Sequence, residues 1–527
     1  MKKAIIISLA LLLSVSYTLG QSTYEKLKRE QEARFKKEQA EQKQRIERNI
    51  RNQDAMIELK VDNQKKRIWL KQSLQSGTPQ PKIDEPDNPR TFDPDNDERI
   101  QFDRIITTPE SDEPFESILK DRENEVDDDA FETIIPQINE EVRVEISGLE
   151  AQFDVDYFGD ALSVNYDPNM FFKMDRVSEN RIEEQVRRLE ASRYMPLLSQ
   201  IKQKQAEYSL NDWGFCHLIN TAAKEMYPYD KNAQTVFNWF MLSKAGYIAT
   251  VCYENNQVFL LAPCKQTLYG KTFLRSNKYG KMYALDLNGG NPEIRSAKVY
   301  YDEDESGVTR GRGNRVLDLK MTQAPNFAPR NKKRLLTFAY EGQNYELPIE
   351  VNVNTIEFFK TYPFVDLDIY MGTPLSSPAQ RTLVASLREM VKDLQPMRNR
   401  RTVEEEQVNF LLRFVQTAFP YQTDAMQFGG EKYLFADEVL FYKYSDCEDR
   451  SVLFSWLVRE IVGLDVVGVL YPGHAATAVS FNRKVPGDYI TYRGKTYTIC
   501  DPTYINANYG MLLPDVRGQI AKVVDHR

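Results

Sequence analysis

The feature that most constrains this chain is a cysteine that begins an apolar stretch with helical spacing and is followed by two strand-like runs. After Cys447, apolar residues such as Val452 and Trp456 recur at helical intervals, which predicts a helix buried along one side. His474 follows 27 residues later in an alternating apolar run, and Asp501 follows after another 27 residues, at the end of a second such run. The pattern predicts an α+β fold with Cys447 at a helix N-terminus.

These three residue types in this order are typical of acyl-transfer chemistry. The free backbone N–H groups and dipole of a helix N-terminus favour a thiolate, which is the nucleophilic form of Cys447. His474 is the candidate base, and Asp501 is the candidate that orients the imidazole. The other two histidines have no evident role as a base, because His217 lies in a packed helical stretch and His526 lies at the end of the chain.

Four segments of the C-terminal part carry the resemblance to a known family. They are residues 433–439, 446–454, 473–475 and 500–503. Together they resemble the transglutaminase-like superfamily, which implies a papain-like Cys-His-Asp core over about residues 380–515. The sequence Asp-Cys-Glu-Asp at 446–449 looks most like the bacterial transglutaminase-like cysteine proteinases of the periplasm. One departure is Ser445, where many relatives have glycine.

The resemblance also implies a metal site beside the nucleophile. In the proteinase relatives, acidic residues that flank the cysteine take part in a calcium site, and Asp446 and Glu448 match that pattern. Calcium prefers oxygen ligands, and a cation would offset the repulsion between these carboxylates and a thiolate. The alternative is that Asp446 caps the helix and Glu448 occupies its first turn. The predicted reaction requires no cofactor, and calcium is the one candidate.

The first 20 residues have the pattern of a signal peptide. Lys2 and Lys3 precede the apolar run at 4–15, and Thr18 and Gly20 are small enough for cleavage after Gly20. We therefore expect an exported protein, located in the periplasm, at the cell surface or outside the cell. No later stretch reaches the apolar length of a membrane span, so no transmembrane segment is expected after cleavage.

An oxidising compartment makes the cysteine count informative. The chain has five cysteines, so at least one thiol stays unpaired in a monomer. We expect Cys447 to be this unpaired cysteine. Cys252 and Cys264 form the best local pair for a disulfide, which could close a hairpin. A buried thiol is the favoured state of Cys500, because it lies in a strand beside Asp501.

Two segments of opposite charge follow the leader. Residues 24–74 contain 15 Lys and Arg against 9 Asp and Glu, which predicts a charged helix or coiled coil over 21–75 that either contacts a helix or cell-envelope partner or is a solvated spacer. Residues 83–129 contain 18 acidic against 5 basic residues with repeated X-Pro steps, which predicts an acidic disordered linker over 76–139. This linker supplies most of the net charge of −8, and nucleic-acid binding is not expected.

Three folded regions are expected after the linker. We assign an α+β domain to 140–290, with a long helical stretch at about 180–208, a small antiparallel β unit to 291–371, and the catalytic domain to 372–527. Residues 230–242 line up without gaps on 446–458, so that Lys231 stands at the place of Cys447 and Gln257 stands near that of His474. One hypothesis is a degenerate copy of the same core. The alternative is two unrelated units that both place strands after a helix.

These observations predict an exported cysteine enzyme that acts on a protein or peptide substrate. We expect hydrolysis of amide or peptide bonds through Cys447, His474 and Asp501, on the strength of the Asp-Cys-Glu-Asp resemblance. Two alternatives stay open: a protein cross-linking transglutaminase, and a non-catalytic envelope scaffold or binding protein built on the same folds.

Overall fold

The structure is a computed structural model that describes residues 151–276, 278–290, 292, 294–300, 313–394, 402–429 and 431–526. The expected signal peptide, charged helix and acidic linker lie outside these residues. So do residues 140–150, the first part of the expected α+β domain. Within the described ranges, no helix combines the length and the apolarity that crossing a membrane requires.

The first half of the described chain contains a hairpin, four α-helices and a five-stranded sheet. In chain order the elements are β1 (Ala151–Tyr157), β2 (Asp160–Tyr166), the 3-10 turn η2 (Pro168–Met170), α2 (Glu179–Ala191), α3 (Tyr194–Glu207), α4 (Asp212–Met226), α5 (Lys231–Lys244), β3 (Thr250–Glu254), β4 (Gln257–Ala262), β5 (Phe273–Ser276), β6 (Gly280–Leu285) and β7 (Lys298–Val299). The sheet has the strand order β5-β6-β4-β3-β7, and its neighbouring strands are antiparallel.

The second half has the same order of elements: a hairpin, then helices, then a five-stranded sheet. Its first elements are β8 (Asn331–Tyr340), β9 (Gln343–Asn352), α6 (Val353–Phe359), α7 (Leu367–Gly372), α8 (Ser377–Ala379), the π-helical η3 (Gln380–Val384), α9 (Ala385–Lys392), α10 (Val403–Ala418), α11 (Asp424–Gln427) and α12 (Ala436–Phe441). They are followed by α13 (Cys447–Leu457), the π-helical η4 (Val458–Val462), β10 (Asp465–Tyr471), β11 (His474–Ser480), β12 (Tyr489–Tyr492), β13 (Lys495–Cys500), η5 (Pro514–Val516) and β14 (Lys522–Val524). The second sheet has the order β12-β13-β11-β10-β14 and is also antiparallel.

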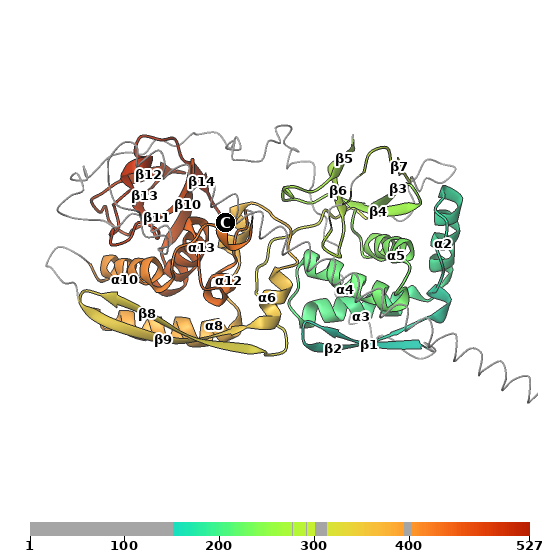
Figure 1. Ribbon diagram of the computed structural model, residues 1–527, viewed down its shortest axis with the longest axis horizontal. Helices are drawn as coiled ribbons and strands as arrows, with labels where there is room; N and C mark the ends of the chain where they lie inside the picture. Colours follow the sequence, from blue (N-terminus) through green and yellow to red (C-terminus); the bar gives the residue numbers. More distant parts are fainter. Residues whose placement is uncertain are drawn as a thin grey trace, which may run out of the picture. The chain divides into compact units, whose positions relative to one another are not determined.

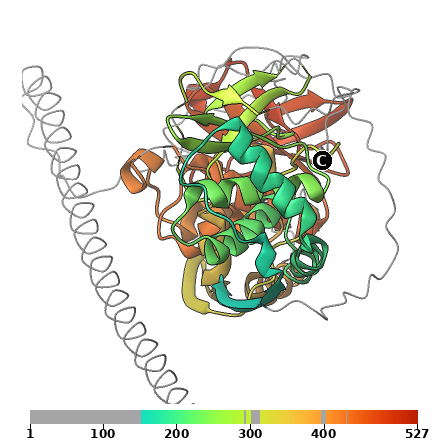
Figure 2. The ribbon, with the colours of Figure 1, turned by 90° about the vertical axis from the view of Figure 1, so that its right-hand side faces the viewer.

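Each half is layered in the same way. Helices lie between a two-stranded hairpin on one side and the five-stranded sheet on the other (Figures 1 and 2). In the second half, α13 packs on β11, and α10 packs on both α13 and β8. Ten of the eleven residues of α13 are buried, so the helix that begins at Cys447 is enclosed on all sides and not, as its sequence pattern predicts, along one side only. The fold is therefore α+β, with helix packed on antiparallel sheet.

Two expected segments differ from the observed elements. The helical stretch expected at 180–208 is two helices, because Ser192 takes an extended conformation and its backbone N–H bonds to the Leu189 carbonyl to end α2. The interval 291–371, expected as a small β unit, divides between its neighbours. β7 pairs with β3 of the first sheet, β8 and β9 form the hairpin that packs on α10, and the residues after Asn352 form α6 and α7.

All five cysteines are free thiols, so the disulfide considered between Cys252 and Cys264 is not formed. The register of the hairpin gives the physical reason. Cys252 of β3 lies opposite Phe259 of β4, whereas Cys264 lies beyond the end of β4 and bridges to Leu317. The two cysteines therefore do not face each other across the strands. Cys447 and Cys500 are both buried.

Candidate active site

Cys447 is the first residue of α13, at the N-terminus of the helix as the sequence predicts. The preceding residue, Asp446, caps the helix, because its carboxylate accepts the backbone N–H of Asp449 at 3.4 Å. In return the Asp449 carboxylate accepts the N–H of Asp446 at 3.3 Å, which completes a reciprocal capping box. The cap fixes the first turn, and with it the position of a cysteine that is only 7% exposed.

His474 and Asp501 come from neighbouring strands of the sheet that α13 covers. His474 is the first residue of β11, after a two-residue turn in which Gly473 has a φ of 74°. Asp501 follows the last residue of β13. Because Thr477 pairs with Cys500, the start of β11 and the end of β13 lie at the same end of the sheet. The His474 Nε2 and Asp501 Oδ2 atoms are 2.7 Å apart.

The carboxylate of Asp501 is itself held in place. It has no exposed surface, and its Oδ1 accepts the backbone N–H groups of Thr503 at 2.9 Å and Tyr504 at 3.0 Å. Its Oδ2 is therefore fixed toward the imidazole of His474. Because this bond uses Nε2, Nδ1 is the ring nitrogen that can exchange a proton with a thiol or a leaving group.

The hydrogen bonds of the Cys447 sulfur differ from those expected of a finished triad. The backbone N–H of Ala475, the residue directly after His474, bonds to the sulfur. The thiol itself donates to Oε2 of Glu448 at 2.8 Å. In the described part of the chain no hydrogen bond joins the thiol to the imidazole, since the thiol directs its hydrogen to the Glu448 carboxylate. The structure thus brings Cys447 against the strand that begins with His474, but the two side chains are not directly paired.

The electrostatics of the thiol also differ from the expectation. Burial raises the pKa of Cys447 well above its ordinary value, and the charges of Glu448 and Asp446 raise it further. These effects outweigh the stabilisation that a helix N-terminus gives to a thiolate. For His474, burial lowers the pKa, but the charge and hydrogen bond of Asp501 and the charge of Glu448 prevail and raise it. Both shifts favour the protonated forms, the neutral thiol over the thiolate and the imidazolium over the neutral ring.

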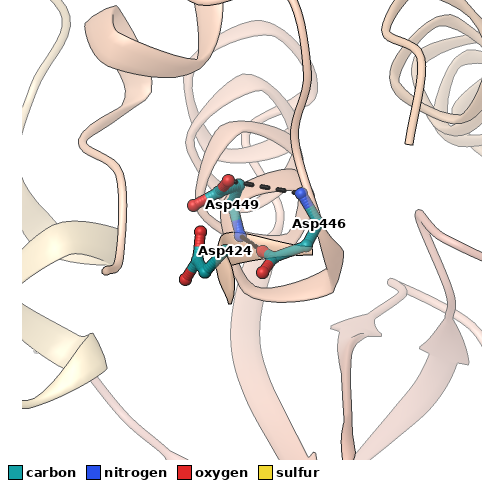
Figure 3. Close-up of side chains that lie close together, drawn as sticks. All are labelled: Asp424, Asp446 and Asp449. Carbon is teal, nitrogen blue, oxygen red and sulfur yellow. Dashed lines mark hydrogen bonds between the residues drawn. The ribbon is translucent and has the colours of Figure 1, made fainter. Parts of the chain in front are cut away.

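Three buried aspartates lie together at the start of α13 (Figure 3). Asp424, Asp446 and Asp449 each offer a carboxylate oxygen within 4.8 Å of the others. Burial raises the pKa of Asp424 to about 7 and that of Asp446 to about 11, and nearby carboxylates add to both shifts. Asp424 is 4% exposed, and its Oδ1 atom is buried without a hydrogen-bond partner. Three negative charges at this spacing therefore need protons or a cation between them.

The cluster changes the expected metal site. Asp446 belongs to it, but the Glu448 side chain bonds to the thiol, whereas Asp424 and Asp449 were not anticipated as ligands. Asp449 carried a signal, since it stands three residues after the cap. Asp424 carried none, because the fold alone brings it to α13. The donor set fits calcium, because it consists of hard carboxylate oxygens and one of them is buried and unpartnered.

Arg450 is a buried cation that holds the chain segment leading to the site. It is 1% exposed, and its guanidinium donates to the carbonyls of Phe419 at 2.7 Å and Gln416 at 3.4 Å, and to the Ser445 hydroxyl at 3.3 Å. The guanidinium also lies over the Tyr421 ring, 5.4 Å from its centroid. Arg450 therefore joins the end of α10 to the turn before Cys447.

Replacement of Arg450 by alanine is expected to lower the free energy of unfolding by about 3 kcal/mol, because buried carbonyls lose their donor and a cavity opens. The measurement is urea unfolding followed by fluorescence. A suitable control is Arg388→Ala, because Arg388 forms an ion pair with Glu460 in which both side chains are more than 40% exposed. That change is expected to cost less than about 1 kcal/mol. Equal losses in the two variants would contradict the structural role assigned to Arg450.

Comparisons of the chain with models of known families, with curated proteins and with solved structures find no match.

Proposed function

We propose that this chain is an exported cysteine-dependent enzyme with a papain-like core, which hydrolyses amide or peptide bonds in protein or peptide substrates. One observation carries the proposal: the Cys447 sulfur accepts the N–H of Ala475 directly after His474, while His474 is held at 2.7 Å by the buried Asp501. Nucleophile, base and orienting carboxylate thus come from α13, β11 and the end of β13.

The arrangement supports a two-step acyl transfer. The thiol leaves Glu448 and gives its proton to Nδ1 of the His474 imidazole once that ring is neutral. The sulfur then attacks the substrate carbonyl, and the new C–S bond forms a thioester as the C–N bond breaks. His474 returns the proton to the departing amine, and water hydrolyses the thioester. The backbone N–H of Cys447 is one donor available to the oxyanion.

A non-catalytic binding protein is the second candidate, and two observations favour it. The thiol donates to Glu448 and not to the imidazole, and its pKa lies well above the ordinary value. Both features oppose a preformed thiolate. In this role the same fold would bind an envelope component, and residues 24–74 would contact a helix or surface partner.

A single assay separates these functions. The purified chain is incubated with a mixture of peptides and a fluorescent primary amine, and the products are identified by mass spectrometry. Hydrolysis gives new carboxyl termini, whereas a cross-linking transglutaminase transfers the acyl group to the added amine. Hydrolysis that disappears in Cys447→Ala supports the proposal. Unchanged peptides under all conditions, with folded protein, would favour the binding protein.

Calcium is part of the proposal as a structural cation held by Asp424, Asp446 and Asp449, where it would neutralise the charges beside the nucleophile. We expect calcium to raise the melting temperature, since a ligand at one hundred times its dissociation constant stabilises by about 2.7 kcal/mol. Asp424→Asn is expected to raise the melting temperature without calcium and to abolish the calcium-dependent shift, because it removes one buried charge.

Asp437→Asn is the matched control for this prediction. Asp437 is also buried, and its pKa is also raised, to about 6, but its carboxylate bonds to the backbone and hydroxyl of Ser376 and lies outside the cluster. The control is expected to keep the calcium shift. A calcium shift that persists in Asp424→Asn, or hydrolysis unaffected by a strong chelator, would exclude this role for calcium.

A further inference from the structure

We infer that the first half of the described chain carries a second, silent copy of the candidate active site, in which Lys231, Gln257 and Asp286 occupy the places of Cys447, His474 and Asp501. The inference rests on strand register and helix capping, so it does not depend on the proposed hydrolysis. It assigns a site to a part of the molecule that the mechanism above does not use.

The two five-stranded sheets have one topology. Ordered by their position in the chain, the strands of each sheet run third, fourth, second, first, fifth across the sheet. In each, a helix leads into the first strand, through the π-helical η4 in the second half, and packs against the central strand: α5 against β4, and α13 against β11. Two unrelated units that place strands after a helix have no reason to share this full order.

The register of the central hairpins places Gln257 where His474 stands. In the first sheet Glu254 pairs with Gln257 across a two-residue turn, and in the second sheet Tyr471 pairs with His474 across a two-residue turn. The two turns have the same length but different residues. Asn255 and Asn256 both have positive φ in the first, whereas the second is Pro-Gly with positive φ at the glycine. Gln257 and His474 are thus the first residues of equivalent strands.

The next strand pair places Asp286 where Asp501 stands. In each sheet, the residue three positions after Gln257 or His474 lies opposite a residue that directly precedes an aspartate. The pairs are Leu260 with Leu285 and Thr477 with Cys500. Asp286 and Asp501 therefore follow equivalent strands at the same register. The carboxylate of the set is kept, whereas Gln257 replaces the titratable imidazole of His474.

The helix ends place Lys231 where Cys447 stands. Asp230 caps α5 by accepting the N–H of Ala233, three residues on, as Asp446 accepts that of Asp449. A second contact is made from the same helix position in both copies, three residues after Lys231 and three after Cys447. Gln234 donates to the Tyr227 carbonyl at 2.7 Å, as Arg450 donates to the Phe419 carbonyl at 2.7 Å. In both copies the accepting residue is followed by Pro and then Tyr.

The two copies differ at two further places. In the first half Asp230 directly follows the Pro-Tyr pair, whereas residues 422–445 are inserted at that point in the second half and bring Asp424 to the cluster. In addition, the N–H of Val258 bonds to the Asn232 side chain, whereas the corresponding N–H of Ala475 bonds to sulfur. The first copy thus has a capped helix and a carboxylate, but no thiol and no base.

The silent copy is therefore two substitutions away from a nucleophile, a base and a carboxylate. Lys231 and Gln257 are both exposed, so a small reagent can reach side chains placed there. In a Cys447→Ala background, Lys231→Cys alone should behave as an ordinary exposed thiol. Adding Gln257→His should raise its rate of alkylation by iodoacetamide at about pH 6 roughly tenfold, the effect of a one-unit fall in thiol pKa. Peptide mass spectrometry assigns the alkylated residue.

Thr235→Cys is the matched control, because position 235 lies one helical turn further along α5 on the same side. Its alkylation should not respond to Gln257→His. Adding Asp286→Asn should cancel most of the gain at position 231. A rate at position 231 that Gln257→His leaves unchanged within about twofold, in folded protein, would overturn the equivalence.

A measurement without any added thiol guards against failure of that variant to fold. In Gln257→His alone, the imidazole pKa measured by NMR should fall when Asp286→Asn is added, as expected if Asp286 faces the ring as Asp501 faces His474. A pKa that does not respond to Asp286→Asn would also overturn the inference. Neither experiment requires the second half to be an enzyme, so failure here and failure of the proposed hydrolysis are distinguishable.

Discussion

Replacement of Cys447 by alanine is expected to abolish labelling of the protein by an electrophilic amide-type probe. The reason is that Cys447 alone combines a helix N-terminus, a backbone donor to its sulfur and a nearby strand that begins with His474, whose ring bonds to Asp501. None of the other buried thiols combines these features: Cys216 lies within α4, Cys252 lies within β3 and Cys500 ends β13. Labelling is measured by in-gel fluorescence and located by peptide mass spectrometry.

Matched variants make this result specific. Cys500→Ala is expected to keep full labelling, although Cys500 is also buried and lies next to Asp501. His474→Ala is expected to lower the labelling rate by about a hundredfold, the usual contribution of a general base. Glu448→Gln is expected to keep or increase labelling. The Glu448 carboxylate accepts the thiol hydrogen and raises the pKa of the thiol, and the substitution removes both effects. Labelling that persists in Cys447→Ala contradicts the assignment of the nucleophile.

Asp501→Asn is expected to lower kcat/KM by about three to four orders of magnitude, as removal of the orienting carboxylate does in comparable triads. An asparagine side chain can still accept the N–H groups of Thr503 and Tyr504 through Oδ1, so the local fold is retained. What is lost is the negative charge and the correct acceptor for the His474 ring. The measurement is hydrolysis of the best peptide substrate as a function of pH.

The direction of the pH effect follows from the same contact. In the wild type, Asp501 and Glu448 raise the pKa of His474 against the effect of burial. Without the Asp501 charge the imidazole is expected to lose its proton at a lower pH, so the basic form appears at more acidic pH. The control is Asp488→Asn, because Asp488 is another buried aspartate beside the same sheet and accepts the N–H of Leu512. Equal losses of activity in both variants would indicate a general effect on stability.

The local parts of this site were predictable from the sequence. The start of α13 at Cys447 follows from the apolar spacing after it and from a capping aspartate before it. The positions of His474 and Asp501 at strand ends follow from alternating runs bounded by turn residues. These features depend on neighbouring residues, so a sequence pattern is enough to indicate them.

The non-local parts could not be predicted in the same way. The bond from the thiol to Glu448 depends on which of several nearby acceptors the folded site presents, and the raised pKa of Cys447 depends on how deeply the thiol is buried. Asp424 reaches the cluster through the inserted residues 422–445, which no periodicity connects to α13. The ungapped alignment suggested Lys231 as a counterpart of Cys447, and strand pairing fixes the register that puts Asp286 at the place of Asp501.

The shared register of the two sheets has a consequence for how this chain can change over evolutionary time. A repeated core separates two demands that a single core must meet together, because one repeat can conserve reactive groups while the other keeps only the residues that preserve its shape. Substitutions at Lys231 and Gln257 are then free of chemical selection, whereas the capping Asp230 remains constrained. Homologous sequences are then expected to vary at the positions of Lys231 and Gln257 and to keep those of Cys447 and His474.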